Sequence, residues 1–563
     1  NYRDNQGIVQ GVNFDRLNTR LNINHSAING RLRFQFNGAV NNRNQESINL
    51  GAFRYAVIYN PTAPVFERDR PGATAEEIAN AEDRFGGYFQ RDLFDFYNPV
   101  ALANQQTYVN ERKSFLTSYR AEFDIIDQLT LAVNYSQDIQ TGIEGFYQSK
   151  QDIVTGLGGN GIARRFTFDN FNQLARATLN YTETFGDLNL SVLGGVESQI
   201  NEDEGFAAQV RNFLFDDVGF DNLGFGGVRI GNNTDVSSYR SRDILNSAFA
   251  RVNGTFANTY FVSLSMRADS YSGFGDNQKT GYFPAASVGV ELTELFDLGP
   301  VNNLKVRASY GVTGNLPPSP YLAVANFDVG NRIDLDDDPR TPGDVFVAPR
   351  QTTNPNPELK WETKAEINVG ADFAIFDRLS GSVDYYRRDV SDLLFNVPVV
   401  NGAPNPFQDG GFNTVGSTWA NIADLSQGGF EFAATYANIP LGPVSWTPSI
   451  NFTIYDKPVI ENFSARGIEQ SEIRIATPGS PGQNNNQIFR NRPGDVIGNM
   501  YGPEFAGLNE VGEYLFFDPE TGEVIDNVGD PEQWGVVGNG LPEGEFGFSN
   551  TFTYGNFDLN FFL

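Results

Sequence analysis

Three aspartates at alternate positions come nearest to the spacing of a metal site. Asp334, Asp336 and Asp338 have the spacing of the first ligands of a calcium-binding loop. Position six of such a loop is Pro339 here rather than Gly, and position twelve is Val345 rather than Glu. An acidic loop without a metal is therefore the favoured interpretation, and a calcium site of another kind stays open. No cofactor is expected.

Groups suited to covalent or acid–base catalysis are scarce. The chain has one histidine, His25, and no cysteine, and no Ser or Asp partner is recognisable around His25. The motif Gly156-x-Gly158-x-x-Gly161 lacks the following helix that a dinucleotide site needs. The 69 carboxylates leave an acidic catalytic pair open, so a hydrolase is kept as an alternative. No enzymatic activity is predicted.

Two arginines and two tryptophans are candidates for substrate binding. Arg387 and Arg388 are expected to end a strand near its loop rim, where they would meet an acidic substrate group. Trp419 and Trp534 are expected in long loops, where an exposed ring can stack on a sugar or pack against a partner. Ordinary salt bridges and loop packing are the plainer interpretation for all four.

These residues are expected to be positioned by β-strands. The chain repeats a unit in which two runs of alternating apolar and polar residues are joined by a short turn. The clearest example spans residues 354–399. Ile367 and Val369 alternate with polar or small residues in its first run, as do Val383 and Tyr385 in its second. Successive strand side chains point to opposite faces, so each run has an apolar and a polar face. Each run is about ten residues long, as a tilted membrane-spanning strand requires.

Eight such hairpins, or sixteen strands, can be laid out along the chain. The predicted pairs are 12–25 with 31–41, 114–125 with 129–139, 172–184 with 188–198, 247–256 with 260–270, 282–292 with 303–312, the pair within 354–399, 428–438 with 444–455, and 544–554 with 557–563. The connections between hairpins are longer and rich in Gly, Pro, Asn and Asp. Short turns on one rim and long loops on the other are typical of an outer-membrane barrel. Within the loop 42–112, a capping box at Thr74 and Glu77 predicts a short amphipathic helix.

Composition and charge further narrow the class of protein. The net charge of −29 disfavours nucleic acid, which requires a basic surface. No stretch approaches the roughly 18 consecutive apolar residues of a membrane-spanning helix. No signal peptide is recognisable, and the chain opens and stops within the repeating pattern, so we expect it to be part of a longer mature protein.

Several stretches of the sequence resemble the SusC/RagA group of TonB-dependent outer-membrane transporters. They are Arg307–Asn315 with Asn356–Glu362, Asp384–Leu394 with Gly429–Phe432, and Gly494–Gly498 with Gly555–Leu559. The family's fold is a barrel of 22 strands enclosing a plug. The resemblance therefore implies an all-β transmembrane antiparallel barrel with long extracellular loops. Residues 1–563 would be its barrel domain, with the N-terminal plug, the TonB box and the C-terminal strands outside this chain.

The resemblance also implies a function. It implies active uptake of oligosaccharides or oligopeptides across the outer membrane, with a SusD-like lipoprotein on the extracellular rim. TonB–ExbB–ExbD would act through the plug, and a dimer of transporter–lipoprotein pairs stays open. A passive porin, or an adhesin that presents its loops, is the alternative. The sequence does not identify the substrate.

Overall fold

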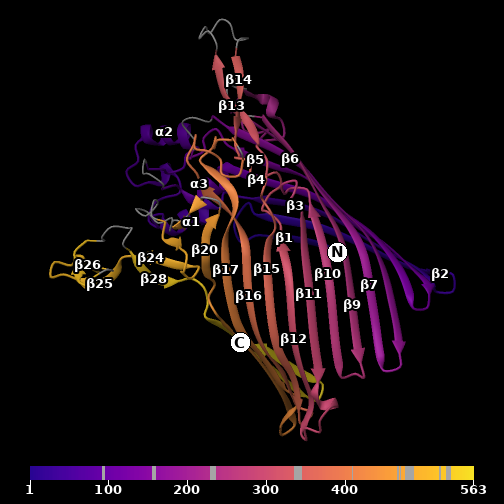
Figure 1. Ribbon diagram of the computed structural model, residues 1–563. Coiled ribbons are helices and arrows are strands. Elements are labelled where there is room, and N and C mark those ends of the chain that lie inside the picture. Colours follow the sequence, from indigo (N-terminus) through magenta and orange to yellow (C-terminus); the bar gives the residue numbers. More distant parts are fainter. Residues whose placement is uncertain are drawn as a thin grey trace. The chain divides into compact units, whose positions relative to one another are not determined.

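The protein is built mainly from antiparallel strands with a few short helices, as the computed structural model shows (Figure 1). The structure describes residues 1–91, 96–154, 160–227, 236–334, 345–408, 410–465, 468–469, 471–475, 487–518, 521–527 and 534–563. The chain forms two compact units. Unit 1 comprises Asn1–Leu179 and Val196–Asn246, and unit 2 comprises Asn180–Gly195 and Ser247–Leu563.

Unit 1 contains a meander of long strands in which sequence neighbours pair. Strands β1 to β5 pair antiparallel in order. Their bounds, with those of the next strands along the chain, are β1 Tyr2–Gln6, β2 Asn13–Ala27, β3 Leu32–Ser47, β4 Gln106–Ile126, β5 Leu129–Gln148, β6 Ile162–Phe185, β7 Leu188–Phe213 and β9 Val236–Phe256. Strands β6, β7 and β9 contribute residues to both units.

Unit 2 continues with the same architecture. Its long strands pair antiparallel in the order β10, β11, β12, β15, β16, β17, β19, β29, β30. Their bounds are β10 Tyr260–Tyr271, β11 Thr280–Glu291, β12 Val301–Asn315, β15 Glu362–Ile375, β16 Leu379–Pro398, β17 Ser417–Tyr436, β19 Val444–Tyr455, β29 Gly544–Tyr554 and β30 Phe557–Phe562.

Shorter elements lie in the connections. The helices are α1 Gly51–Ile58, η1 Glu67–Asp69, α2 Ala75–Phe85, α3 Pro99–Gln105, η2 Leu223–Phe225 and η3 Leu292–Glu294. The short strands are β8 Gly226–Gly227, β13 Phe327–Asp334, β14 Val345–Gln351, β18 Ile439–Leu441, β20 Val459–Ala465, β21 Ile468–Glu469, β22 Ile473–Ile475, β23 Phe489–Asn491, β24 Asn499–Gly502, β25 Glu504–Leu508, β26 Tyr514–Phe517, β27 Val524–Ile525 and β28 Gly535–Asn539. No helix in these described ranges has the length and apolar character needed to span a membrane.

The eight predicted hairpins are confirmed, and most of their strands are longer than predicted at the loop ends. Strand β4 begins at Gln106 rather than near 114, and β5 continues to Gln148 rather than to 139. Ladder hydrogen bonds continue where both faces of a sheet meet water, but there the alternation of apolar and polar residues fades. A pattern search therefore finds the membrane-spanning part of each strand and misses its extension.

The predicted faces of the hairpin at 354–399 are also confirmed. Ile367 is 52% exposed and Val369 is 47% exposed, as expected of side chains that meet lipid. On the opposite face, Asp384 and Tyr386 are buried. The long paired strands of each unit form what we call its wall. The apolar face of a wall carries exposed apolar side chains such as Ile367, and the polar face is the opposite one.

The apolar cores of the molecule lie among the loops and strand ends rather than along the wall. In unit 1, helices α1 and α3 pack together around Ala52, Tyr55 and Leu102. Helix α2 has the predicted capping box, in which Glu77 N–H donates to Thr74 Oγ1 over 3.2 Å. In unit 2, Val397 and Phe463 belong to a second buried cluster. These cores hold the loops in fixed positions above the strands.

Candidate functional site

The polar face of unit 2 carries a charged cluster that joins three neighbouring strands. Arg307 on β12 lies between Asp372 on β15 and Asp384 on β16. Its Nε donates to Asp372 over 3.1 Å, and its Nη2 donates to Asp384 over 2.7 Å. Gly370 makes room for the cluster, since a Cβ there would lie 2.4 Å from Asp384 Oδ1. The cation is fully matched by carboxylates.

A further ion pair and two cation–π contacts extend this charged surface. Arg388 donates to Glu366 over 2.6 Å and lies 4.4 Å from the centre of the Tyr386 ring. The Nζ of Lys305 lies 3.9 Å from the centre of the Phe261 ring. Two cavities of about 370 and 260 Å³ lie along this face, lined largely by serine and small residues. Cations such as Lys305 and Arg307 are costly in lipid, so these contacts favour a face that meets water.

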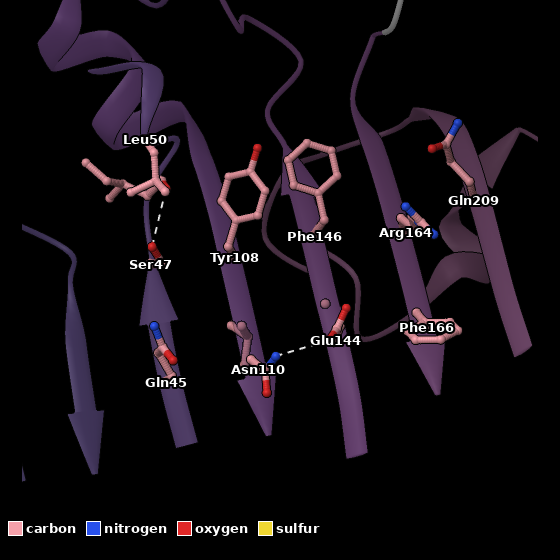
Figure 2. Close-up of a pocket in the computed structure, with 13 residues that line it drawn as sticks. Gln45, Ser47, Leu50, Tyr108, Asn110, Glu144, Phe146, Arg164, Phe166 and Gln209 are labelled. Carbon is pink, nitrogen blue, oxygen red and sulfur yellow. Dashed lines mark hydrogen bonds between the residues drawn. The ribbon is translucent and has the colours of Figure 1, made fainter. Parts of the chain in front are cut away.

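Unit 1 holds a cavity of about 710 Å³, larger than these two, on the polar face of its wall near the loop ends (Figure 2). Two rows of side chains cross the strands there. The register places Ser47, Tyr108 and Phe146 side by side in one row, and Gln45, Asn110 and Glu144 in the next. Arg164 and Phe166 of β6 and Gln209 of β7 complete the lining, with Leu50 above.

The cavity lining combines hydrogen-bonding side chains with aromatic rings. Asn110 Nδ2 donates to Glu144 Oε1 over 3.2 Å, and the Tyr108 and Phe146 rings lie 4.8 Å apart at 38°. Arg164 is exposed and makes no ion pair within the described part of the chain. Planar donors and acceptors beside aromatic rings suit a ligand with both hydroxyl groups and apolar faces. Among the described residues that line the cavity, none forms a nucleophile–base pair.

The two candidate arginines are not brought together. Arg387 and Arg388 lie in the interior of β16, which continues to Pro398, so the prediction that they end a strand is wrong. Consecutive strand residues point to opposite faces. Arg387 is exposed on the apolar face and pairs with Asp389 over 3.3 Å, whereas Arg388 lies on the polar face. One substrate group cannot contact both.

Of the two candidate tryptophans, one lies in a loop as predicted and the other lies in a strand. Trp419 lies within β17 rather than in a loop, and its carbonyl accepts a hydrogen bond from Asn356 Nδ2 over 2.9 Å. Trp534 lies in the connection before β28, partly buried, with the Arg490 guanidinium 5.9 Å from its ring. Packing explains both positions, and a role for either in binding substrate stays a prediction.

Of the calcium candidates, Asp336 and Asp338 lie outside the described residues. The backbone of Asp334 ends β13, and its side chain is also outside the description. Within the described ranges, no group of three or more acidic or histidine side chains is placed to hold a metal ion.

Charged residues also organise the loop segment after β21 in unit 2. Glu472 forms ion pairs with both Arg474 and Arg492, the latter over 2.5 Å. Burial acts to raise the pKa of Glu472, but the hydrogen bonds from the two arginines outweigh it, so the net pKa shift is downward. Burial and a hydrogen bond to Asp495 raise the pKa of Tyr501. The segment is thus held together by ionic contacts.

The segment that contains Asn354 and overlaps the family stretch Asn356–Glu362 has a structural role that was not predicted from the sequence. Asn354 donates to the carbonyls of Val415 and Ser417 over 2.8 and 2.9 Å. Trp361 is buried, and its Nε1 donates to the Lys279 carbonyl over 2.9 Å. These contacts fix the loop against neighbouring strands.

The lining of the unit 1 cavity was missed as well. Tyr108 and Glu144 lie beyond the predicted strand ends at 114 and 139. A signal was present in Tyr108, Asn110 and Arg112, three large polar or aromatic side chains spaced two apart.

Comparisons with known proteins agree with this architecture. The family described as "TonB dependent receptor-like, beta-barrel" matches residues 60–505. The TonB-dependent receptor P3 of Formosa agariphila is 31% identical over 498 residues, covering 83% of this chain and 46% of that protein. The TonB-dependent receptor SusC of Bacteroides thetaiotaomicron is 24% identical over 470 residues, covering 80% of this chain and 44% of that protein. The chain thus spans about half the length of these relatives.

Solved structures support the same fold. The structure of the RagAB peptide transporter superposes with a TM-score of 0.75 at 19% identity, covering 98% of this chain and 57% of that chain. The predicted fold class and the predicted outer-membrane location are confirmed. The chain belongs to the TonB-dependent receptor-like β-barrel family, in its SusC/RagA group of outer-membrane proteins.

Proposed function

We propose that the chain forms the barrel part of a TonB-dependent importer that takes up oligosaccharides or oligopeptides. The observation that carries this proposal is the two-faced wall, apolar on one side and lined by charged and hydrogen-bonding groups on the other. A polar face with a cavity of about 710 Å³ offers contacts to a large hydrophilic solute. The RagAB peptide transporter, which has the same fold, supports oligopeptides, and the resemblance to the SusC/RagA group supports oligosaccharides.

Energy coupling belongs to the same proposal. TonB, ExbB and ExbD would act through a plug, for which residues 1–563 supply the barrel. Support comes from family membership and from the relatives' length, about twice that of this chain. The wall itself would supply contacts along the path of the solute and no chemical step.

A SusD-like lipoprotein is the proposed partner on the extracellular loops. The small sheet of β25, β26 and β27 exposes a set of large apolar side chains, which monomeric surfaces seldom do. Phe505 and Leu508 are each 57% exposed, and Tyr514 is 67% exposed. Covering them with a partner would remove this apolar surface from water. A dimer of transporter–lipoprotein pairs is part of the proposal.

Growth on the transported nutrient tests the proposal. Cells carrying the full-length protein should lose growth on it when TonB is deleted, while growth on a monosaccharide or a free amino acid remains. A passive porin needs no energy source, so uptake that persists without TonB would contradict active import.

Co-purification tests the partner. Deleting residues 504–525, which carry the exposed sheet, should reduce recovery of the lipoprotein while the barrel remains in the outer membrane. Replacing the hairpin turn Gly186–Asp187 by Asn-Gly is the matched control, because it changes a turn between β6 and β7 instead. Full recovery of the lipoprotein after the deletion would exclude this docking surface.

A further inference from the structure

Four arginines lie in one row across the first four strands of unit 1. The register pairs Arg3 with Arg16, Arg16 with Arg43, and Arg43 with Arg112. All four are on the polar face, since Leu17 and Phe115, their neighbours along β2 and β4, are exposed on the apolar face. We call this set the arginine row.

The arginine row is unusual on energetic grounds. Like charges directly opposite each other on a sheet are destabilising. In a chain with a net charge of −29, carboxylates to neutralise them are abundant. Yet within the described part of the chain, none of the four forms an ion pair with a carboxylate. Arg43 instead donates to the Gln45 amide oxygen, and Arg112 lies 5.0 Å from the centre of the Phe168 ring.

Neutral hydrogen-bonding groups flank the arginine row on one side. The next row toward the turns contains four uncharged polar side chains, which are Asn18, Asn41, Ser114 and Gln140. The Oδ1 atoms of Asn18 and Asn41 have no hydrogen-bond donor within the described residues. These amide oxygens are acceptors, so they suit a ligand that brings its own donors.

The cavity described above flanks the arginine row on the other side. The row next to it contains Gln45, Asn110 and Glu144, and the aromatic pair Tyr108 and Phe146 follows (Figure 2). The polar face therefore presents, in succession, neutral amides, guanidinium groups, further amides with one carboxylate, and aromatic rings.

The spacing of the arginine row suits a chain of repeated anionic groups. Neighbouring strands lie about 4.8 Å apart, so four arginines span roughly 14 Å. Each guanidinium presents a planar fork of donors that matches a carboxylate or a sulfate ester. Amide oxygens accept from hydroxyl groups, and aromatic rings pack against the apolar face of a sugar ring.

We propose that the arginine row, together with the cavity beside it, binds an acidic oligosaccharide that carries a carboxylate or a sulfate ester on successive sugars. The inference rests on the proposed import function and narrows its solute class. An acidic peptide would satisfy the guanidinium groups, but it brings fewer hydroxyl donors to the amide oxygens on either side.

Calorimetric titration of the detergent-purified full-length protein tests this with four probes. They are a hexasaccharide of galacturonic acid, a sulfated galactan hexasaccharide, a neutral galactan hexasaccharide and hexaglutamate. At least one acidic sugar should bind more tightly than both the neutral sugar and the peptide, and its affinity should fall as salt rises. The preferred acidic sugar distinguishes carboxylate from sulfate recognition.

Two variants locate the site. Replacing both Arg43→Gln and Arg112→Gln should weaken binding of that sugar at least about tenfold and flatten its salt dependence. Arg120→Gln is the matched control, because Arg120 lies eight residues from Arg112 on the same strand and face but pairs with Glu122 over 2.5 Å. Heat-modified migration on gels shows that each variant remains folded.

Several outcomes would overturn the proposal. Tighter binding of hexaglutamate or of the neutral sugar would do so, as would no binding of either acidic sugar or unchanged affinity in the double variant. Failure of the import function is a separate result, because it appears as growth that no longer depends on TonB while the titration is unaffected.

Discussion

The Arg307 cluster on the polar face of unit 2 and the arginine row on the polar face of unit 1 have opposite electrostatic surroundings. In unit 2, Arg307 is matched by two carboxylates on the adjacent strands. In unit 1, Arg3, Arg16, Arg43 and Arg112 lie in a row without an ion pair to a carboxylate in the described residues. Both walls belong to the same chain and share the same two-faced pattern.

This difference distinguishes charged residues that stabilise the wall from charged residues that are available to bind a ligand. An arginine that is paired with carboxylates on adjacent strands links those strands, and few of its hydrogen-bond donors remain to bind a solute. Cations kept next to one another cost stability, and that cost is offset when an anion arrives. Mutating one of each kind should therefore change stability in opposite directions.

The apolar faces of the two walls are expected to meet lipid, and a substitution of Leu264 tests this. Leu264 is 53% exposed on the apolar face of β10, and Ser265 lies on the polar face beside it. Leu264→Arg should destabilise the inserted protein by about 2–4 kcal/mol, because a charge then faces hydrocarbon. Urea unfolding in lipid vesicles measures this. Ser265→Arg is the control, and an equal loss in both variants would show that the face assignment is wrong.

Removing the matched cation should also destabilise. Arg307→Met leaves Asp372 and Asp384 facing each other without their shared partner, and the Asp384 side chain is only 10% exposed. We expect a loss of about 1–3 kcal/mol, below the range for fully buried pairs because the Arg307 side chain is 35% exposed. Urea unfolding in lipid vesicles measures this loss of stability. Arg307→Met combined with Asp384→Asn should recover part of the loss, and no recovery would mean that packing rather than charge is responsible.

Removing a cation from the arginine row should have a smaller effect of the opposite sign. Arg112→Met relieves the repulsion from Arg43 directly opposite and keeps a long side chain near Phe168. Stability without ligand should stay unchanged or rise by about 0.2–1 kcal/mol. High salt should shrink the gain, since it screens the repulsion in the parent protein. A loss as large as that of Arg307→Met would erase the distinction between the two regions.

The hairpins could be predicted from the sequence, whereas the arginine row could not. Alternation alone predicted the hairpins, because one face of each strand meets lipid. The pairing of Arg16 with Arg43 follows from the short turn at Ile28–Gly30. The pairing of Arg43 with Arg112 does not, because the long segment between β3 and β4 sets no register. The row, like the cavity beside it, becomes visible only when the strands are placed side by side.

The loop segment of unit 2 offers a third kind of ionic site, outside the wall. Glu472 is paired with Arg474 and Arg492, and the pKa of Glu472 is lowered. Because the folded state holds this carboxyl deprotonated more strongly than the unfolded state, its contribution is present at neutral pH and is lost as the pH falls below about 4.5 toward the folded-state pKa.

Hydrogen exchange of residues 487–492 should reveal this loss between pH 6 and pH 3. After correction for the intrinsic exchange rate, protection should fall by the equivalent of a few tenths of a kcal/mol, the usual range for partly exposed ion pairs. Glu472→Gln should show the lower protection already at pH 6 and little further change. A pH response that survives in Glu472→Gln would place the titrating group elsewhere. If instead it disappears, paired arginines stabilise the loops as well as the wall of unit 2, and the unpaired row of unit 1 stands apart from both.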